Sequence, residues 1–121
     1  MRIVNEDFLT LTKTVVTVFE DMDLEEIQEL ANVLTKTCRI GSRPFRKIGH
    51  ALQMKRTVTD FDFETVEYVI ERIFRDNGEL MITLLEHTDG GIAEPETIEW
   101  TDTINDFLHE VVGVPLFYDF E

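Results

Sequence analysis

Apolar residues recur every three or four positions along most of this chain, which is the spacing that places side chains on one face of an α-helix. The clearest stripe consists of Phe63, Val66, Ile70 and Ile73. Similar stripes lie before and after it, and together they predict helices over residues 8–22, 24–38, 42–55, 59–78 and 101–113. The pattern therefore predicts a mainly α protein, a compact bundle of about five helices.

Residues typical of helix ends support several of these boundaries. Asp23, followed three residues later by Glu26, is a capping-box pattern before the second predicted helix, and residues 101–103 offer N-caps before the last one. Asn77 and Gly78 are typical of a helix C-terminus, and we interpret them as the end of the fourth helix.

Two segments leave a β structure open. Residues 10–18 are rich in Thr and Val, whose branched side chains favour a strand, although the apolar spacing there favours a helix. Residues 79–100 combine a short apolar run with a turn signal at Asp89, Gly90 and Gly91. The alternative fold is therefore α+β, with a hairpin or small sheet formed by residues 79–100.

A length of 121 residues is typical of one domain, so we expect residues 1–121 to form a single domain. Glu6 and Asp7 lie where a secretory signal requires an apolar run, and no segment approaches the roughly 20 apolar residues of a membrane span. The only cysteine, Cys38, has no partner for an internal disulfide. We therefore expect a cytoplasmic protein that is not associated with a membrane.

The charge changes this picture most. The chain has 25 acidic and 11 basic residues, which give a net charge of −14, so its long-range field attracts basic surfaces and repels nucleic acid. The distribution is uneven, because residues 30–59 contain seven of the basic residues and no acid. A window of thirty residues without one carboxylate is unlikely to arise by chance in so acidic a chain.

Acidic residues on the exposed sides of the predicted helices form a candidate partner-binding face. On the fourth and last predicted helices this acidic face consists of Glu64, Glu67, Glu71, Asp102 and Asp106. Carboxylates held on ordered helices have the geometry needed to occupy a basic groove on another protein.

The basic segment provides a second candidate surface. We define the basic band as Arg39, Arg43, Arg46, Lys47, Lys55 and Arg56. This band could be neutralised by the acidic remainder of the same domain or of a second copy, which predicts a homodimer that weakens with salt. Contact with a separate partner and contact with nucleic acid are the alternatives, and the net charge opposes the last of these.

The sequence lacks the motifs of an enzyme. It contains no P-loop, no dinucleotide-binding fingerprint and no HExxH zinc motif, and neither His50 nor His87 has an adjacent serine or cysteine that would form a nucleophile and base pair. We therefore expect no catalytic residues, no bound metal and no cofactor.

Together these features predict a non-enzymatic acidic binding protein of the inhibitor or regulator type. Its partner would be a protein with a basic groove, such as a nucleic-acid-handling enzyme, and small accessory proteins of viral or mobile-element origin fit this design. One alternative is an assembly or chaperone-like component that binds through residues 36–56 and the aromatic C-terminal tail. A nucleic-acid-binding regulator is the other.

Overall fold

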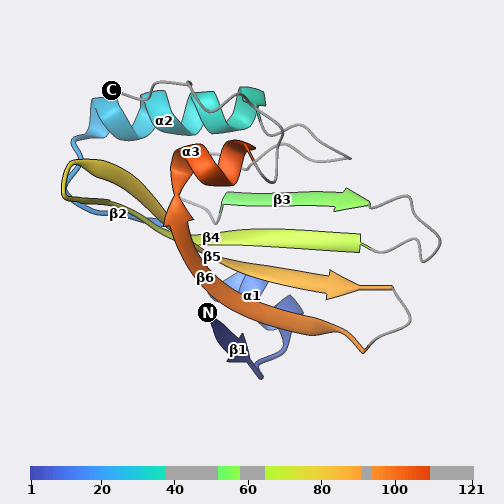
Figure 1. Cartoon of the computed structure of the whole chain (residues 1–121). Helices are drawn as coiled ribbons and strands as arrows, with labels where there is room; N and C mark the ends of the chain where they lie inside the picture. Colours follow the sequence, from blue (N-terminus) through green and yellow to red (C-terminus); the bar gives the residue numbers. More distant parts are fainter. Residues whose placement is uncertain (38–51, 58–64, 91–93, 110–121) are drawn as a thin grey trace.

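A computed structural model of the chain describes residues 1–37, 52–57, 65–90 and 94–109 (Figure 1). Its centre is a mixed sheet of six strands in the order β1-β6-β5-β4-β2, and β3 also pairs with β4. The strands are β1 (Arg2–Val4), β2 (Val18–Phe19), β3 (Leu52–Thr57), β4 (Thr65–Asp76), β5 (Glu79–Asp89) and β6 (Glu96–Thr103). The helices are α1 (Phe8–Thr14), α2 (Leu24–Thr37) and α3 (Ile104–Phe107).

The expectation of a mainly α, helical bundle is wrong. Strands account for 49% of the described residues and helices for 29%. The part of the predicted fourth helix that the structure describes is the long strand β4, and residues 79–100 belong to β5 and β6. These two strands do pair as an antiparallel hairpin, but within a six-stranded sheet and not as an addition to a bundle.

A β-bulge in β4 explains why its sequence resembles a helix. The register with β5 shifts between Ile70 and Arg72, so Glu71 is an extra residue in β4. Ile70 lies opposite Leu84 and Ile73 lies opposite Ile82, which places both isoleucines on the same face although they are three residues apart. The bulge therefore produces a helix-like spacing inside a strand.

The sheet buries side chains on both faces, with α2 and α3 on one side and α1 on the other (Figure 1). The larger core, on the α2 and α3 face, consists of Leu30, Val66, Tyr68, Ile70, Ile73, Ile82, Leu84, Ile104, Phe107 and Leu108. The smaller core, on the α1 face, consists of Val4, Phe8, Leu11, Val69 and Leu85. A strand buried on both faces has a nearly continuous apolar sequence, which periodicity alone does not distinguish from a helix.

The helix predicted over residues 8–22 is wrong in its second half. α1 ends at Thr14, because the backbone of Val15 is already extended, and β2 follows at Val18. The buried Thr17 hydroxyl donates a hydrogen bond of 2.6 Å to the carbonyl oxygen of Ile70 in β4. The branched residues of this segment therefore extend along the sheet instead of continuing the helix.

The second predicted helix is confirmed as α2. An Asp23 carboxylate oxygen accepts a hydrogen bond of 2.8 Å from the backbone amide of Glu26, which caps the first turn. The start of the last predicted helix is also confirmed, since the Thr103 hydroxyl accepts a 3.1 Å hydrogen bond from the amide of Asp106 at the start of α3.

Asn77 and Gly78 form the two-residue turn between β4 and β5, so our interpretation of this pair as a helix end is wrong. Both have positive φ angles, 51° and 83°, as the tight turns that join antiparallel strands require. Of the helix predicted over residues 42–55, only residues 52–55 are described, and they are part of β3.

Candidate functional site

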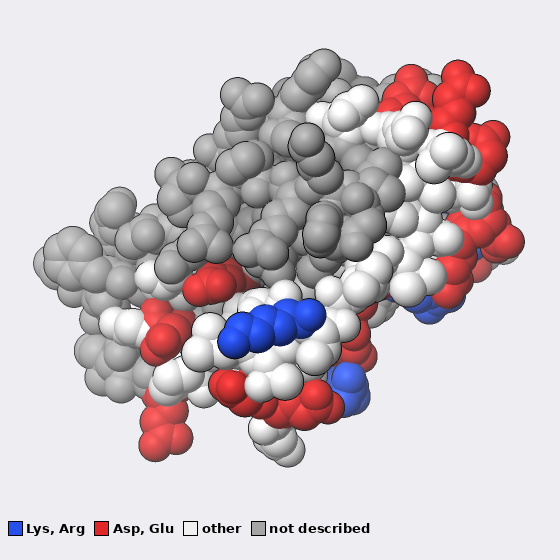
Figure 2. Space-filling model, turned by 180° about the vertical axis from the view of Figure 1, so that it is seen from behind, with Lys and Arg blue, Asp and Glu red and all other residues white. Residues whose placement is uncertain are grey.

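Carboxylates gather at one end of the molecule, around the start of α2 and the turn between β4 and β5 (Figure 2). We define this acidic end as Glu20, Asp21, Asp23, Glu25, Glu26, Glu29, Asp76 and Glu79. The two chain segments meet there because the amide of Glu20 donates a 2.9 Å hydrogen bond to the carbonyl of Ile73 and because Arg75 contacts Glu26. Figure 2 shows the acidic side chains along one edge of this view.

Two arginines lie at the acidic end, and each is already paired. Arg72 contacts Glu20 at 2.9 Å and also lies over the Phe74 ring, 3.9 Å from its centroid. Arg75 contacts Glu26 at 3.2 Å. The other six carboxylates are exposed and make no ion pair with any group that the structure describes. The acidic end therefore presents an ordered surface with a large excess of negative charge.

The structure does not bring the predicted acidic face together. Glu67 and Glu71 lie in β4 and not on a helix, while Asp102 lies in β6 and Asp106 in α3. Glu67 lies two positions before Val69 in β4 and therefore on the same face, the α1 face. Asp102 lies opposite Ile82, which belongs to the core of the other face. The fifth predicted residue, Glu64, is outside the described residues.

Most of the basic band also lies outside the described residues. Arg39, Arg43, Arg46 and Lys47 fall in this undescribed part of the chain. Lys55 and Arg56 are in β3, where their backbones lie opposite Glu67 and Val66 of β4. The predicted neutralisation of the band therefore stays a prediction.

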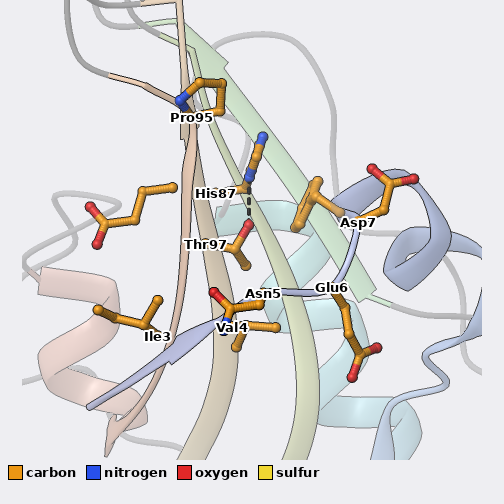
Figure 3. Close-up of a pocket in the computed structure, with 10 residues that line it drawn as sticks. Ile3, Val4, Asn5, Glu6, Asp7, His87, Pro95 and Thr97 are labelled. Atoms are coloured by element: carbon orange, nitrogen blue, oxygen red, sulfur yellow. Dashed lines mark hydrogen bonds between the residues drawn. The ribbon is translucent and has the colours of Figure 1, made fainter.

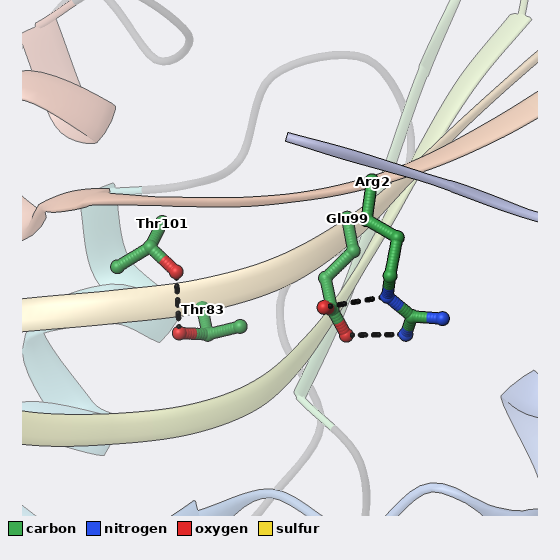
Figure 4. Close-up of polar contacts among 4 residues, drawn as sticks. All are labelled: Arg2, Thr83, Glu99 and Thr101. Atoms are coloured by element: carbon green, nitrogen blue, oxygen red, sulfur yellow. Dashed lines mark hydrogen bonds and ion pairs between the residues drawn. The ribbon is translucent and has the colours of Figure 1, made fainter.

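Glu71 is half-buried rather than part of a solvated face, and it lies beside Glu99 of β6. Glu99 accepts two hydrogen bonds from the Arg2 guanidinium, at 3.1 and 3.0 Å, and so joins β6 to β1 (Figure 4). Burial and the neighbouring Glu99 raise the pKa of Glu71 to about 7. Hydrogen bonds from Arg2 and Glu71 lower the pKa of Glu99. Glu71 is therefore protonated over much of the range in which Glu99 is charged.

These pKa shifts predict a specific pH dependence of stability. The raised pKa of Glu71 means that folding favours its protonated form, so its contribution to stability falls as the pH rises from about 4.5 to about 7. Glu71→Gln should therefore leave the melting temperature unchanged near pH 5 and raise it near pH 8. Thermal melts should show a rise of about 4 °C for this variant near pH 8. This rise corresponds to about 1 kcal/mol, once the effect is reduced for the partial exposure of Glu71. An equal change at both pH values would contradict this prediction.

A polar hollow of about 320 Å³ lies between the segment that follows β1 and the adjoining ends of β5 and β6 (Figure 3). In its wall the His87 ring stacks on the Phe8 ring with their centroids 4.3 Å apart, and the His87 Nδ1 atom is 2.6 Å from the Thr97 hydroxyl. The carboxylates of Glu6 and Asp7, however, point in different directions and not toward the imidazole. No group of three or more metal-ligating side chains occurs among the described residues.

None of the protein-family models, curated proteins or solved structures with which the chain was compared matches it. No helix in the described ranges is long and apolar enough to cross a membrane. Of the features described, the acidic end and the carboxyl pair of Glu71 and Glu99 have the clearest chemistry. Residues 20–29 contain six acidic residues and no basic one, a signal in the sequence that our choice of acidic face overlooked.

Proposed function

We propose that this protein is a non-enzymatic, cytoplasmic binding protein that uses its acidic end to engage a basic surface on a protein partner. An inhibitor or regulator of a nucleic-acid-handling enzyme fits this proposal, because such enzymes carry basic grooves. The observation that carries the proposal is the ordered cluster of six exposed carboxylates, with both nearby arginines already committed to Glu20 and Glu26.

The fixed positions of the carboxylates matter as much as their charge in this proposal. The carboxylates at the acidic end are positioned by the first turns of α2, by the capping of α2 through Asp23 and by the tight turn at Asn77 and Gly78. A surface whose charges are already fixed loses little conformational entropy when it meets a complementary surface. It also directs the approach of an oppositely charged partner, which raises the association rate.

Charge reversal at the acidic end should separate site-specific binding from general attraction. In Glu25→Lys/Glu29→Lys/Glu79→Lys, affinity for a labelled Lys/Arg-rich peptide should fall at least about tenfold, because each substitution replaces attraction with repulsion. Fluorescence anisotropy at two salt concentrations measures this. The affinity of the parent protein should fall as salt rises, since the screening length is about 10 Å at 0.1 M.

The matched control reverses three charges that lie away from the acidic end, near the end of β5 and the start of β6. In Glu86→Lys/Glu94→Lys/Glu96→Lys the net charge changes equally, but affinity should fall less than about threefold. Both variants should retain the circular dichroism spectrum of the parent, because single surface substitutions cost about 0.5 kcal/mol or less. Equal losses of affinity in the two variants would mean that net charge alone attracts the peptide and that the acidic end is not the binding site.

A further inference from the structure

The sheet face that packs against α1 extends beyond that helix. In β5 the side chains of Leu85, Thr83 and Met81 alternate with core residues of the opposite face and therefore lie together on this one. Leu85 belongs to the smaller core under α1. With seven residues α1 is about 10 Å long, whereas the 11 residues of β5 span about 36 Å. The helix therefore covers only part of the face, and the part toward the turn between β4 and β5 lies beyond it.

Apolar side chains occupy the part of this face beyond α1. We define the uncovered face as Val18, Arg72, Phe74, Met81, Thr83 and Thr101, which strand pairing places on the same side of the sheet. Val18 is 50% exposed. Phe74 and Met81 lie opposite each other, are half-buried and belong to neither core cluster of the described residues. Apolar sheet faces are normally covered by a second layer, and no helix in the described ranges provides that layer here.

The polar groups of the uncovered face are paired with one another or with the acidic end. The hydroxyls of Thr83 and Thr101 lie 2.8 Å apart and form a hydrogen bond (Figure 4). The Arg72 guanidinium contacts Glu20 at 2.9 Å and lies over the Phe74 ring. Polar groups that already have partners lose less when water is removed than unpaired groups do. A partner can therefore cover this face at little cost in lost hydration.

Carboxylates of the acidic end border the uncovered face. Asp76 lies two positions after Phe74 in β4, and Glu79 lies two positions before Met81 in β5. Strand alternation therefore places both carboxylates on the same side of the sheet as the apolar pair. Asp76 and Glu79 lie opposite each other, and both are exposed. A segment that complements this arrangement must combine apolar side chains with neighbouring Lys or Arg side chains.

The following inference rests on the proposed function and names the kind of segment that the partner supplies. We propose that the uncovered face and the acidic end together bind a basic amphipathic helix of the partner. Its apolar side covers Phe74 and Met81, and its basic side chains contact Asp76 and Glu79. A helix fits because α1 already packs on the same face of the sheet. A second copy of this chain does not fit, since a symmetric contact through this surface would bring two acidic ends together.

Two peptides of identical Leu, Ala and Lys content test this proposal by fluorescence anisotropy at one salt concentration. In the first, the leucines recur every three or four residues and form one helical face. In the second, the same residues are rearranged so that the leucines are spread around the helix. The parent protein should bind the first peptide at least about tenfold more tightly, because only that peptide can bury its leucines on the uncovered face.

Polar substitutions of similar shape should remove this preference without changing the charge. In Val18→Thr/Met81→Gln the two affinities should differ by less than about threefold, because hydration of the new polar groups opposes burial. The matched control Ile3→Thr/Leu9→Gln makes comparable changes at side chains that are 63% and 67% exposed in β1 and α1, and it should retain the preference. Circular dichroism melts establish that both variants fold.

NMR of the unsubstituted protein provides a measurement that does not depend on any variant folding. Addition of the first peptide should shift the methyl signals of Val18 and Met81 and leave those of Ile3 and Leu9 in place. Equal affinity for the two peptides, or shifts at Ile3 and Leu9 instead, would overturn the inference. Larger shifts of Val18 and Met81 with a single-stranded oligonucleotide, or a parent dimer that Val18→Thr/Met81→Gln disrupts in sedimentation, would also overturn it.

Failure of the proposed function gives a different result. In that case Glu25→Lys/Glu29→Lys/Glu79→Lys would bind both peptides as tightly as the parent does, whatever the preference between them. If the acidic end is the binding site but the uncovered face is not, the charge reversal weakens both peptides and the parent binds them equally. If both proposals hold, the reversal weakens both peptides and the preference depends on Val18 and Met81.

Discussion

Insertion of one alanine between Arg72 and Ile73 should remove most of the stability of the protein. Without a compensating bulge, every position of β4 after the insertion moves to the opposite face of the sheet, since side chains alternate along a strand. Ile73, which is fully buried opposite Ile82, would leave the core, and the inserted alanine would take its place. Replacing a buried isoleucine by alanine costs about 2–5 kcal/mol. This cost approaches the total stability of about 5–15 kcal/mol that is typical of a small domain.

Circular dichroism melts and the dispersion of the NMR spectrum measure this effect. The matched control is deletion of Glu71, which removes the extra residue of the bulge. Ile70 and Ile73 are then two positions apart and still share a face, so this variant should melt cooperatively. An insertion variant that melts within a few degrees of the parent would show that β4 accommodates the added residue in a second bulge.

The same bulge explains why the sequence predicts the wrong element here. Val66, Ile70 and Ile73 are spaced by four and three residues, as on a helix, but the three-residue step spans Glu71. A regular strand would have placed its core residues at even spacing and would have been recognised by alternation. Asn77 and Gly78 form the tight turn after β4, and this residue pair is the local signal that indicates a hairpin instead of a helix end.

Elements whose signals are local were predictable. α2 begins one residue after Asp23, which caps it, and α3 begins one residue after its cap, Thr103. Both helices combine a capping side chain with apolar residues on one face, so capping and periodicity agree. The segment of Thr and Val before β2 is the opposite case, because side-chain branching and apolar spacing disagree there and pairing with β4 decides the outcome.

The candidate sites were likewise predictable only where their signal is local in the sequence. The high density of acids in residues 20–29 is visible in the sequence, although the approach of Asp76 and Glu79 to them depends on the pairing of β2 with β4. The contact between Arg2 and Glu99 joins residues 97 positions apart. Nothing in the local sequence of either residue indicates the other. The raised pKa of Glu71 arises from burial and from the neighbouring Glu99, so it is not visible before the fold is known.

Ile70→Ala should destabilise the protein by about 2–5 kcal/mol, because Ile70 is fully buried where β4 meets the larger core and its removal leaves a cavity. Chemical denaturation at constant pH measures the loss in the free energy of unfolding. Ile3→Ala is the matched control, since it removes the same atoms from a side chain that is 63% exposed, and it should cost much less.

The backbone at Ile70 increases the expected difference between these two variants. Its carbonyl accepts the hydrogen bond from the buried Thr17 hydroxyl, which joins β4 to the segment leading into β2. A cavity beneath this residue gives the strand room to shift, and a shift would weaken that buried bond as well as the packing against Leu84. The loss in Ile70→Ala should therefore lie in the upper half of the stated range. Similar losses in Ile70→Ala and Ile3→Ala would mean that the sheet face beneath α2 and α3 is not the main core of the protein.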